Sequence, residues 1–237
     1  MLPVYRMSEG SENLEQNYET FENCKKIFKK NGIVLIFSEG RCVNEWKLRP
    51  LKKGTARLAM SSWQEEIDLK IIPTAINYQS FTSFGKNIQL NFGEIINESD
   101  INANGYGNTI NDFNVKLKRQ LKELTVEIDS DDKKTVRSTF ELKQPLIKKI
   151  LLFLPALAGA MLHFPLYFPI QQLSWHKARH VDHYDSVIVG LLFILYPVYL
   201  LLLAIIVYIF YGAYWWMLVF LLMPFFGWSF VQVKKQF

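Results

Sequence analysis

Cysteine is scarce in this 237-residue sequence, which contains only Cys24 and Cys42. Two cysteines do not make a disulfide framework, so the sequence does not fit a small secreted fold held by disulfides. We expect both thiols to be reduced, in a domain that faces the cytoplasm. We also expect no cleavable signal peptide, because Met1 leads into the letters LPVYR without a basic start and an apolar core.

Charged residues are missing from two long stretches near the C-terminal end. Neither 150–170 nor 186–233 contains Asp, Glu, Lys or Arg, whereas the residues before them have the mixed composition of a soluble domain. A helix over 150–170 would be about 31 Å long, which matches the hydrocarbon core of a bilayer. The second stretch is long enough for two spans and a turn. These features predict an integral membrane protein, with a soluble domain over 1–145 and a membrane domain over 146–237.

The arrangement of the membrane domain follows from its prolines and its basic flanks. A spanning hairpin of 187–210 and 213–232 places the basic residues before and after it in the cytoplasm, as the positive-inside rule requires. The segment 150–170 is basic on both sides and contains Pro155, Pro165 and Pro169, which disrupt helical hydrogen bonding. We favour a re-entrant or interface-lying helix pair there, and a third span remains the alternative.

The net charge of +5 and the pI near 9.0 raise the question of a nucleic-acid partner. The basic residues are scattered or flank apolar stretches, and no recognisable nucleic-acid-binding module accompanies them. We therefore expect no nucleic-acid binding and favour membrane lipids as partners. The sequence does not specify an oligomeric state.

Residues 1–145 show predicted strands that alternate with predicted helices, which is typical of an α/β domain with a partly parallel sheet flanked by helices. Strands are expected over 2–5, 33–37, 69–78 and 87–92, and helices over 17–30, 55–64 and 111–128. The charged run 129–134 is expected to be a solvated loop. In such sheets ligands bind at the carboxyl ends of the strands, and Arg6 and the letters SEGR follow two of these ends.

Four segments resemble, in order, the motifs of the phospholipid/glycerol acyltransferase family, which includes the lysophosphatidate acyltransferases. The segments are LPVYR at Leu2–Arg6, FSEGR at Phe37–Arg41, LKKGTARLA at Leu51–Ala59 and IIPTAINY at Ile71–Tyr78. The second segment is similar to the FPEGTR motif, with Ser38 in place of the usual proline, a change that we expect to loosen the turn.

The resemblance implies a binding site for the phosphate of the acyl acceptor. Guanidinium groups bind phosphate bidentately, so Arg6 and Arg41 would clamp it from adjacent strand ends. Gly40 would let the ligand approach the backbone closely. Glu39 would orient Arg41 or accept a hydrogen bond from a glycerol hydroxyl.

The basic turn completes the expected binding site. Lys53, together with its neighbour Lys52, would add positive potential, and Gly54 would give a tight turn before the next helix.

The family's general base, a histidine in an H-x4-D motif that precedes the arginine strand, is missing, since no histidine precedes His163. His180 and Asp185 have the H-x4-D spacing but follow all the other motifs, so we interpret the match as coincidental. His176, His180 and His183 resemble part of the histidine boxes of membrane di-iron desaturases, but the chain has only four histidines. We expect no metal and no resident cofactor.

The resemblance implies a membrane-bound acyltransferase of phospholipid synthesis. Such an enzyme transfers a fatty acyl group from acyl-CoA or acyl-carrier protein to a lysophosphatidate- or glycerol-phosphate-like acceptor. Without its base, this chain alone is expected to be inactive. We favour an N-terminally shortened enzyme, and the alternative is a catalytically inactive lysolipid-binding membrane protein.

Overall fold

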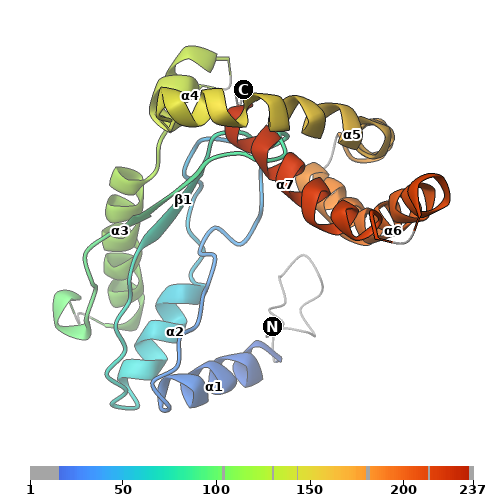
Figure 1. Cartoon of the computed structure of the whole chain (residues 1–237). Coiled ribbons are helices and arrows are strands. Elements are labelled where there is room, and N and C mark those ends of the chain that lie inside the picture. Colours follow the sequence, from blue (N-terminus) through green and yellow to red (C-terminus); the bar gives the residue numbers. More distant parts are fainter. Residues whose placement is uncertain are drawn as a thin grey trace. The chain divides into compact units, whose positions relative to one another are not determined.

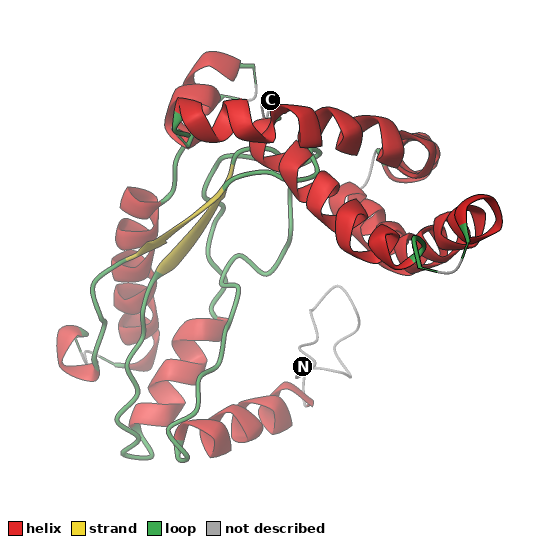
Figure 2. Cartoon of the chain, in the orientation of Figure 1, coloured by secondary structure: helices red, strands yellow, loops and turns green. Residues whose placement is uncertain are grey.

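The computed structural model describes residues 16–102, 105–129, 131–142, 144–179, 182–212 and 214–234 (Figure 1). The elements are α1 (Gln16–Phe28), α2 (Gly54–Trp63), β1 (Thr74–Tyr78), β2 (Ile88–Phe92), η3 (Glu98–Asp100), α3 (Tyr106–Leu124), α4 (Lys133–Phe140), α5 (Leu146–Ala178), α6 (Tyr184–Tyr211) and α7 (Met217–Val233). Helices dominate the described chain (Figure 2).

The chain divides into two compact units, and the division falls within the pair of strands. The first unit comprises Met1–Cys42, Lys47–Asn77 and Leu90–Glu127, and the second comprises Val43–Trp46, Tyr78–Gln89 and Ile128–Phe237. The expected domain boundary near residue 145 stays a prediction, since the second unit takes in residues on both sides of it.

The core of the first unit forms between α2 and α3. Ala56, Ile96 and Phe113 are fully buried there, and the rings of Trp63 and Phe113 meet edge to face with centroids 6.2 Å apart. The indole N–H of Trp63 donates to the carbonyl of Leu69, 2.9 Å away, so its one polar group is satisfied. The amphipathic patterns of the sequence therefore predicted these helices correctly, although α3 begins five residues earlier than expected.

The expected partly parallel sheet is wrong. The described residues contain a two-stranded antiparallel sheet of β1 and β2, and an isolated antiparallel bridge joins Ile71 to Ile96. Residues 79–87 form the hairpin loop that joins β1 to β2. The N–H of Gln79 donates to the carbonyl of Asn87 over 3.0 Å and closes this loop. A short hairpin connects only antiparallel strands, because a parallel pair needs a crossover of a dozen or more residues.

The expected strand over 33–37 is also absent. This segment has no regular secondary structure, and Ile33 and Phe37 are 94% and 69% exposed. An uninterrupted apolar run is typical of a strand covered on both faces, but pairing requires neighbouring strands. No strand in the described part of the chain pairs with this run. The expected strand over 2–5 lies outside the described residues.

A buried asparagine ties β1 to the end of α3. The amide of Asn77 donates to the carbonyl of Leu124 over 3.0 Å, and its side-chain oxygen accepts from the N–H of Val126 over 2.9 Å. Both polar atoms of this side chain therefore have a hydrogen-bond partner, which a buried polar group requires. The charged run 129–134, which was expected to be a loop, contributes to a helix. The side chain of Asp132 caps α4, and the first turn of α4 begins within this run.

In the second unit, α5 is one continuous helix of 33 residues instead of the expected helix pair. It contains all three prolines and makes most of its contacts with α7. Gly159 allows the backbones of α5 and α7 to pack closely, because a Cβ atom at this position would lie 2.1 Å from the carbonyl oxygen of Phe226. By length and composition, α5 and α6 are both long and apolar enough to cross a membrane, and α7 is a shorter apolar helix.

The chain between α6 and α7 is rich in exposed aromatic side chains. Gly212 ends α6 with a φ of +80°, a conformation that favours glycine. Tyr211 and Tyr214 flank it and are both exposed. Such a cluster is typical of a membrane–water interface, where amphipathic rings lie at the level of the headgroups.

Candidate functional site

The segment FSEGR forms a tight turn after the extended run 33–37. The N–H of Gly40 donates to the carbonyl of Phe37 over 3.1 Å, which closes the turn. Gly40 has a φ of +66°, in the left-handed region that side chains with a Cβ atom rarely adopt. The turn therefore requires glycine for its backbone conformation, and the expected close approach of a ligand at Gly40 stays a prediction.

This turn packs against the N-terminal end of α2. The N–H of Lys52 donates to the carbonyl of Ser38 over 2.7 Å, and the hydroxyls of Ser38 and Thr55 are 2.9 Å apart. A Cβ atom on Gly40 would lie 3.1 Å from Cγ of Lys52. Two of the predicted motifs, separated by nine residues in the sequence, therefore form one structural unit.

The N-terminal end of α2 has the properties of an anion-binding site. The first N–H groups of any helix lack intrahelical acceptors and carry the positive end of its dipole. Lys53 occupies the N-cap position without a capping hydrogen bond from its side chain, and the first turn contains no acidic residue. Phosphate groups commonly bind at such helix ends.

Three exposed cationic side chains border this helix end: Arg41, Lys52 and Lys53. Glu39 is half-buried within the turn, and Gly54 opens α2. Exposed cations keep their donors available to a ligand from solvent. The combination of an uncapped helix end and exposed positive charge suits an anion with several oxygen atoms, such as a phosphate monoester.

The structure brings together five of the six predicted site residues along the chain segments 39–41 and 53–54. The sixth, Arg6, lies outside the described residues, so the two-guanidinium clamp stays a prediction. Sequence reasoning missed the contribution of Ser38 and Thr55. The serine was expected to loosen the turn, but its carbonyl and hydroxyl both make contacts that join the turn to α2.

The histidine-rich segment lies in the second unit. Asp185 of the H-x4-D match forms an ion pair with Lys86, and His180 lies outside the described residues. No three His, Cys, Asp or Glu side chains within the described ranges cluster as metal ligands do. The interpretation of the H-x4-D match as coincidental therefore stays a prediction.

Comparison with known proteins gives one match. Residues 2–77 match the family model described as Acyltransferase, which confirms the resemblance drawn from the four motifs. The matched range contains the turn, the N-terminal half of the first unit and α2, and it ends within β1. No curated protein and no solved structure matches the chain.

Proposed function

Starting from the acyltransferase pattern of residues 2–77, we propose that the protein is a membrane-bound acyltransferase of phospholipid synthesis. It takes a fatty acyl group from acyl-CoA or acyl-carrier protein and transfers it to a lysophosphatidate- or glycerol-phosphate-like acceptor. The observation that carries this proposal is the hydrogen-bonded junction of the Phe37–Arg41 turn with the N-terminal end of α2, bordered by exposed cations.

The acceptor's phosphate binds at this junction. Its oxygen atoms accept hydrogen bonds from the first N–H groups of α2, and Arg41 and Lys52 neutralise its charge. The contact of Ser38 with Thr55 holds the turn in place, so that the N–H groups and the cations face one ligand. Arg6 adds a second guanidinium, as the resemblance implies.

The transfer itself moves the acyl group from sulfur to oxygen. The acceptor hydroxyl attacks the thioester carbonyl, its proton passes to a base, and the thiol leaves with a proton. The resemblance implies a histidine of an H-x4-D motif as this base. The printed sequence has no histidine before His163, so the residues described here supply acceptor recognition and not proton transfer.

The second unit places the protein in the membrane through α6 and α7. The hairpin loop of 79–87 contacts both the start of α6 and the end of α7: Lys86 pairs with Asp185, and Lys234 donates to the carbonyl of Phe84 over 3.0 Å. These contacts support a spanning hairpin whose two open ends lie on one side of the membrane. The positive-inside rule makes this side cytoplasmic.

Contacts at the two ends of α5 support an interface-lying position for this helix. Near its start, Lys148 donates to Gln232 at the end of α7 over 2.7 Å, and near its end Trp175 packs against Tyr184 at the start of α6. The ring of Tyr167 meets Phe84 of the hairpin loop between these points. Both ends of α5 thus contact residues at the ends of α6 and α7 that we propose to be cytoplasmic. The middle of α5 also meets the middle of α6, where the hydroxyl of Tyr199 donates to the carbonyl of Leu162 over 2.6 Å.

The proposal is tested by an acyl-transfer assay in lipid vesicles with acyl-CoA and oleoyl lysophosphatidate. The chain is assayed as printed and together with whatever coding sequence precedes Met1 in its gene. We expect phosphatidate to form only with the longer chain, and Arg41→Ala to abolish its formation. Absence of an H-x4-D motif from the preceding sequence, together with absence of turnover, would contradict the proposal.

A further inference from the structure

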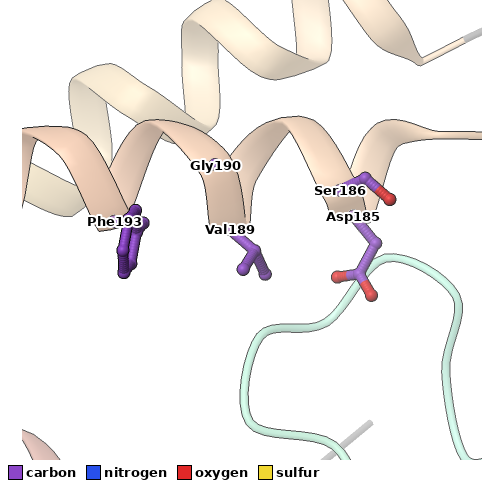
Figure 3. Close-up of a pocket in the computed structure, with 5 residues that line it drawn as sticks. All are labelled: Asp185, Ser186, Val189, Gly190 and Phe193. Atoms are coloured by element: carbon purple, nitrogen blue, oxygen red, sulfur yellow. The ribbon is translucent and has the colours of Figure 1, made fainter. Parts of the chain in front are cut away.

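The surface of α6 contains a hollow that the proposed acyl transfer does not use. It has a volume of about 420 Å³ and is lined by Asp185, Ser186, Val189, Gly190 and Phe193. All five lining residues belong to α6, so the hollow is an open depression on the surface of one helix. Asp185, Val189 and Phe193 point to the same side of the helix, as their spacing of four residues requires (Figure 3).

The part of the hollow that Val189, Gly190 and Phe193 line is apolar and exposed. Val189 and Phe193 are 49% and 82% exposed, and a Cβ atom on Gly190 would meet no atom of the described chain within 4 Å. The missing side chain of Gly190 therefore leaves space between two apolar side chains. Asp185 and Phe193 are eight residues apart, which is about 12 Å along the helix axis.

At the polar end, Asp185 lines the hollow and is paired with Lys86 of the hairpin loop, which lies beside it. Lys86 and Asp185 form an ion pair, and their side chains are 12% and 30% exposed. The ammonium group of Lys86 also lies over the ring of Tyr78, 5.5 Å from its centroid. The hairpin loop that carries Lys86 is held by the bond from Lys234 to Phe84. A ligand therefore meets a pre-positioned cation and a pre-positioned anion beside each other.

We propose that this hollow binds a zwitterionic glycerophospholipid with an ethanolamine headgroup. The headgroup's ammonium pairs with Asp185, its phosphate pairs with Lys86, and one acyl chain lies along Val189, Gly190 and Phe193. Charge complementarity selects this occupant, because an anionic lipid without an ammonium would be repelled by Asp185 and leave this carboxylate unpaired by the ligand. The inference rests on the membrane position proposed for α6 and is separate from acyl transfer.

The test uses the full chain, purified in detergent, delipidated and titrated with dioleoyl phosphatidylethanolamine or dioleoyl phosphatidylglycerol, with native mass spectrometry as the readout. The two lipids have the same acyl chains, so their difference reports on the headgroup. We expect phosphatidylethanolamine to bind about tenfold more tightly than phosphatidylglycerol. Gly190→Leu, which fills the hollow, is expected to remove the bound lipid. Val198→Leu, which places a leucine elsewhere on the exposed surface of α6, is the control.

Asp185→Asn tests the contribution of the headgroup contact separately from that of the acyl-chain contact. We expect it to abolish the preference between the two lipids while lipid still binds. Equal binding of both lipids by the unmodified chain would overturn the proposal, and so would unchanged binding by Gly190→Leu. Tighter binding of phosphatidylglycerol would show a general anionic-lipid contact instead. Failure of the proposed function is recognised separately, by loss of acyl transfer with this lipid preference intact.

Discussion

The backbone N–H of Lys52 donates a hydrogen bond to the carbonyl of Ser38, and the two atoms are 2.7 Å apart. This bond joins the turn of the FSEGR segment to the residues that lead into α2. It places a glycine with a positive φ, an uncapped helix end and exposed cations in one small region of the first unit. The proposed phosphate site depends on this junction.

Replacement of Gly40 is expected to destabilise the turn. Gly40→Ala forces a residue with a Cβ atom into a φ of +66° and brings that atom within 3.1 Å of the Lys52 side chain. The left-handed conformation alone costs about 1–2 kcal/mol, so the melting temperature should fall. Gly107→Ala is the matched control, because Gly107 lies inside α3 with open space around it. This control should raise the melting temperature slightly, and equal effects of both variants would contradict the account.

The ion pairs of Glu65 predict a pH-dependent contribution to stability. The ammonium groups of Lys25 and Lys29 both bind the Glu65 carboxylate, Lys29 at 2.7 Å, and they lower the pKa of Glu65 below its ordinary value. A carboxyl group with a lowered pKa in the folded state stabilises the fold at neutral pH. This contribution is lost as the pH falls below the ordinary glutamate pKa and through the lowered one.

Thermal unfolding of Glu65→Gln tests this prediction. We expect the variant to melt below the unmodified protein at pH 7, because buried Lys25 loses one of its two carboxylate partners. The difference should shrink steadily as the pH is lowered below about 4, where the carboxyl group becomes protonated. A difference in melting temperature that is the same at pH 7 and below about pH 4 would show that Glu65 acts through packing and not through its charge.

Asn77 is expected to be important for the first unit. Its side chain makes two hydrogen bonds to the backbone at the C-terminal end of α3 and just beyond it, and it is only 4% exposed. Asn77→Ala leaves the carbonyl of Leu124 with one fewer donor and the N–H of Val126 without this acceptor, at a cost of about 1–3 kcal/mol. Chemical denaturation should show this loss, and a change below about 0.5 kcal/mol would contradict the assigned role.

The proposed topology predicts which side of the membrane each segment faces. Cys42 is exposed, whereas burial raises the pKa of the Cys24 thiol and makes it a poor nucleophile, so Cys42 reports on the soluble part. A membrane-impermeant maleimide should label Trp215→Cys in intact cells when Cys42 is replaced by serine. Unmodified Cys42 should react only after permeabilisation.

A second labelling variant distinguishes an interface-lying α5 from a spanning one. Lys177→Cys, in the same Cys42→Ser background, should require permeabilisation, because both ends of α5 are proposed to lie on the cytoplasmic side. Labelling of this variant in intact cells would show that α5 crosses the membrane and would contradict the proposed topology.

Local patterns in the sequence predicted the local elements well. The spacing of apolar residues gave α1 and α2 within about two residues at each end, and the strand expected over 87–92 gave β2. The candidate turn was also predictable, because glycine between Glu39 and Arg41 indicates a conformation that other residues avoid. These features depend on near neighbours in the chain, so a sequence pattern contains enough information to find them.

Features that depend on distant partners were not predictable. The apolar run 33–37 has the composition of a buried strand, but composition does not say whether a neighbouring strand is present to pair with it. The contact of Ser38 with Thr55 joins residues 17 positions apart. The prolines of α5 suggested a broken helix, but packing against neighbouring helices allows a helix to continue through proline in an apolar environment.

The most direct test of the account is the binding of oleoyl lysophosphatidate to the purified chain in detergent, measured by calorimetry. We expect Arg41→Ala and Lys52→Ala each to weaken binding by about tenfold or more, since each removes a charged hydrogen bond worth about 1.5–3 kcal/mol. Arg57→Ala, which removes an exposed cation one turn further along α2, should leave the affinity unchanged. Equal affinity of all four proteins for lysophosphatidate would contradict the proposed phosphate site.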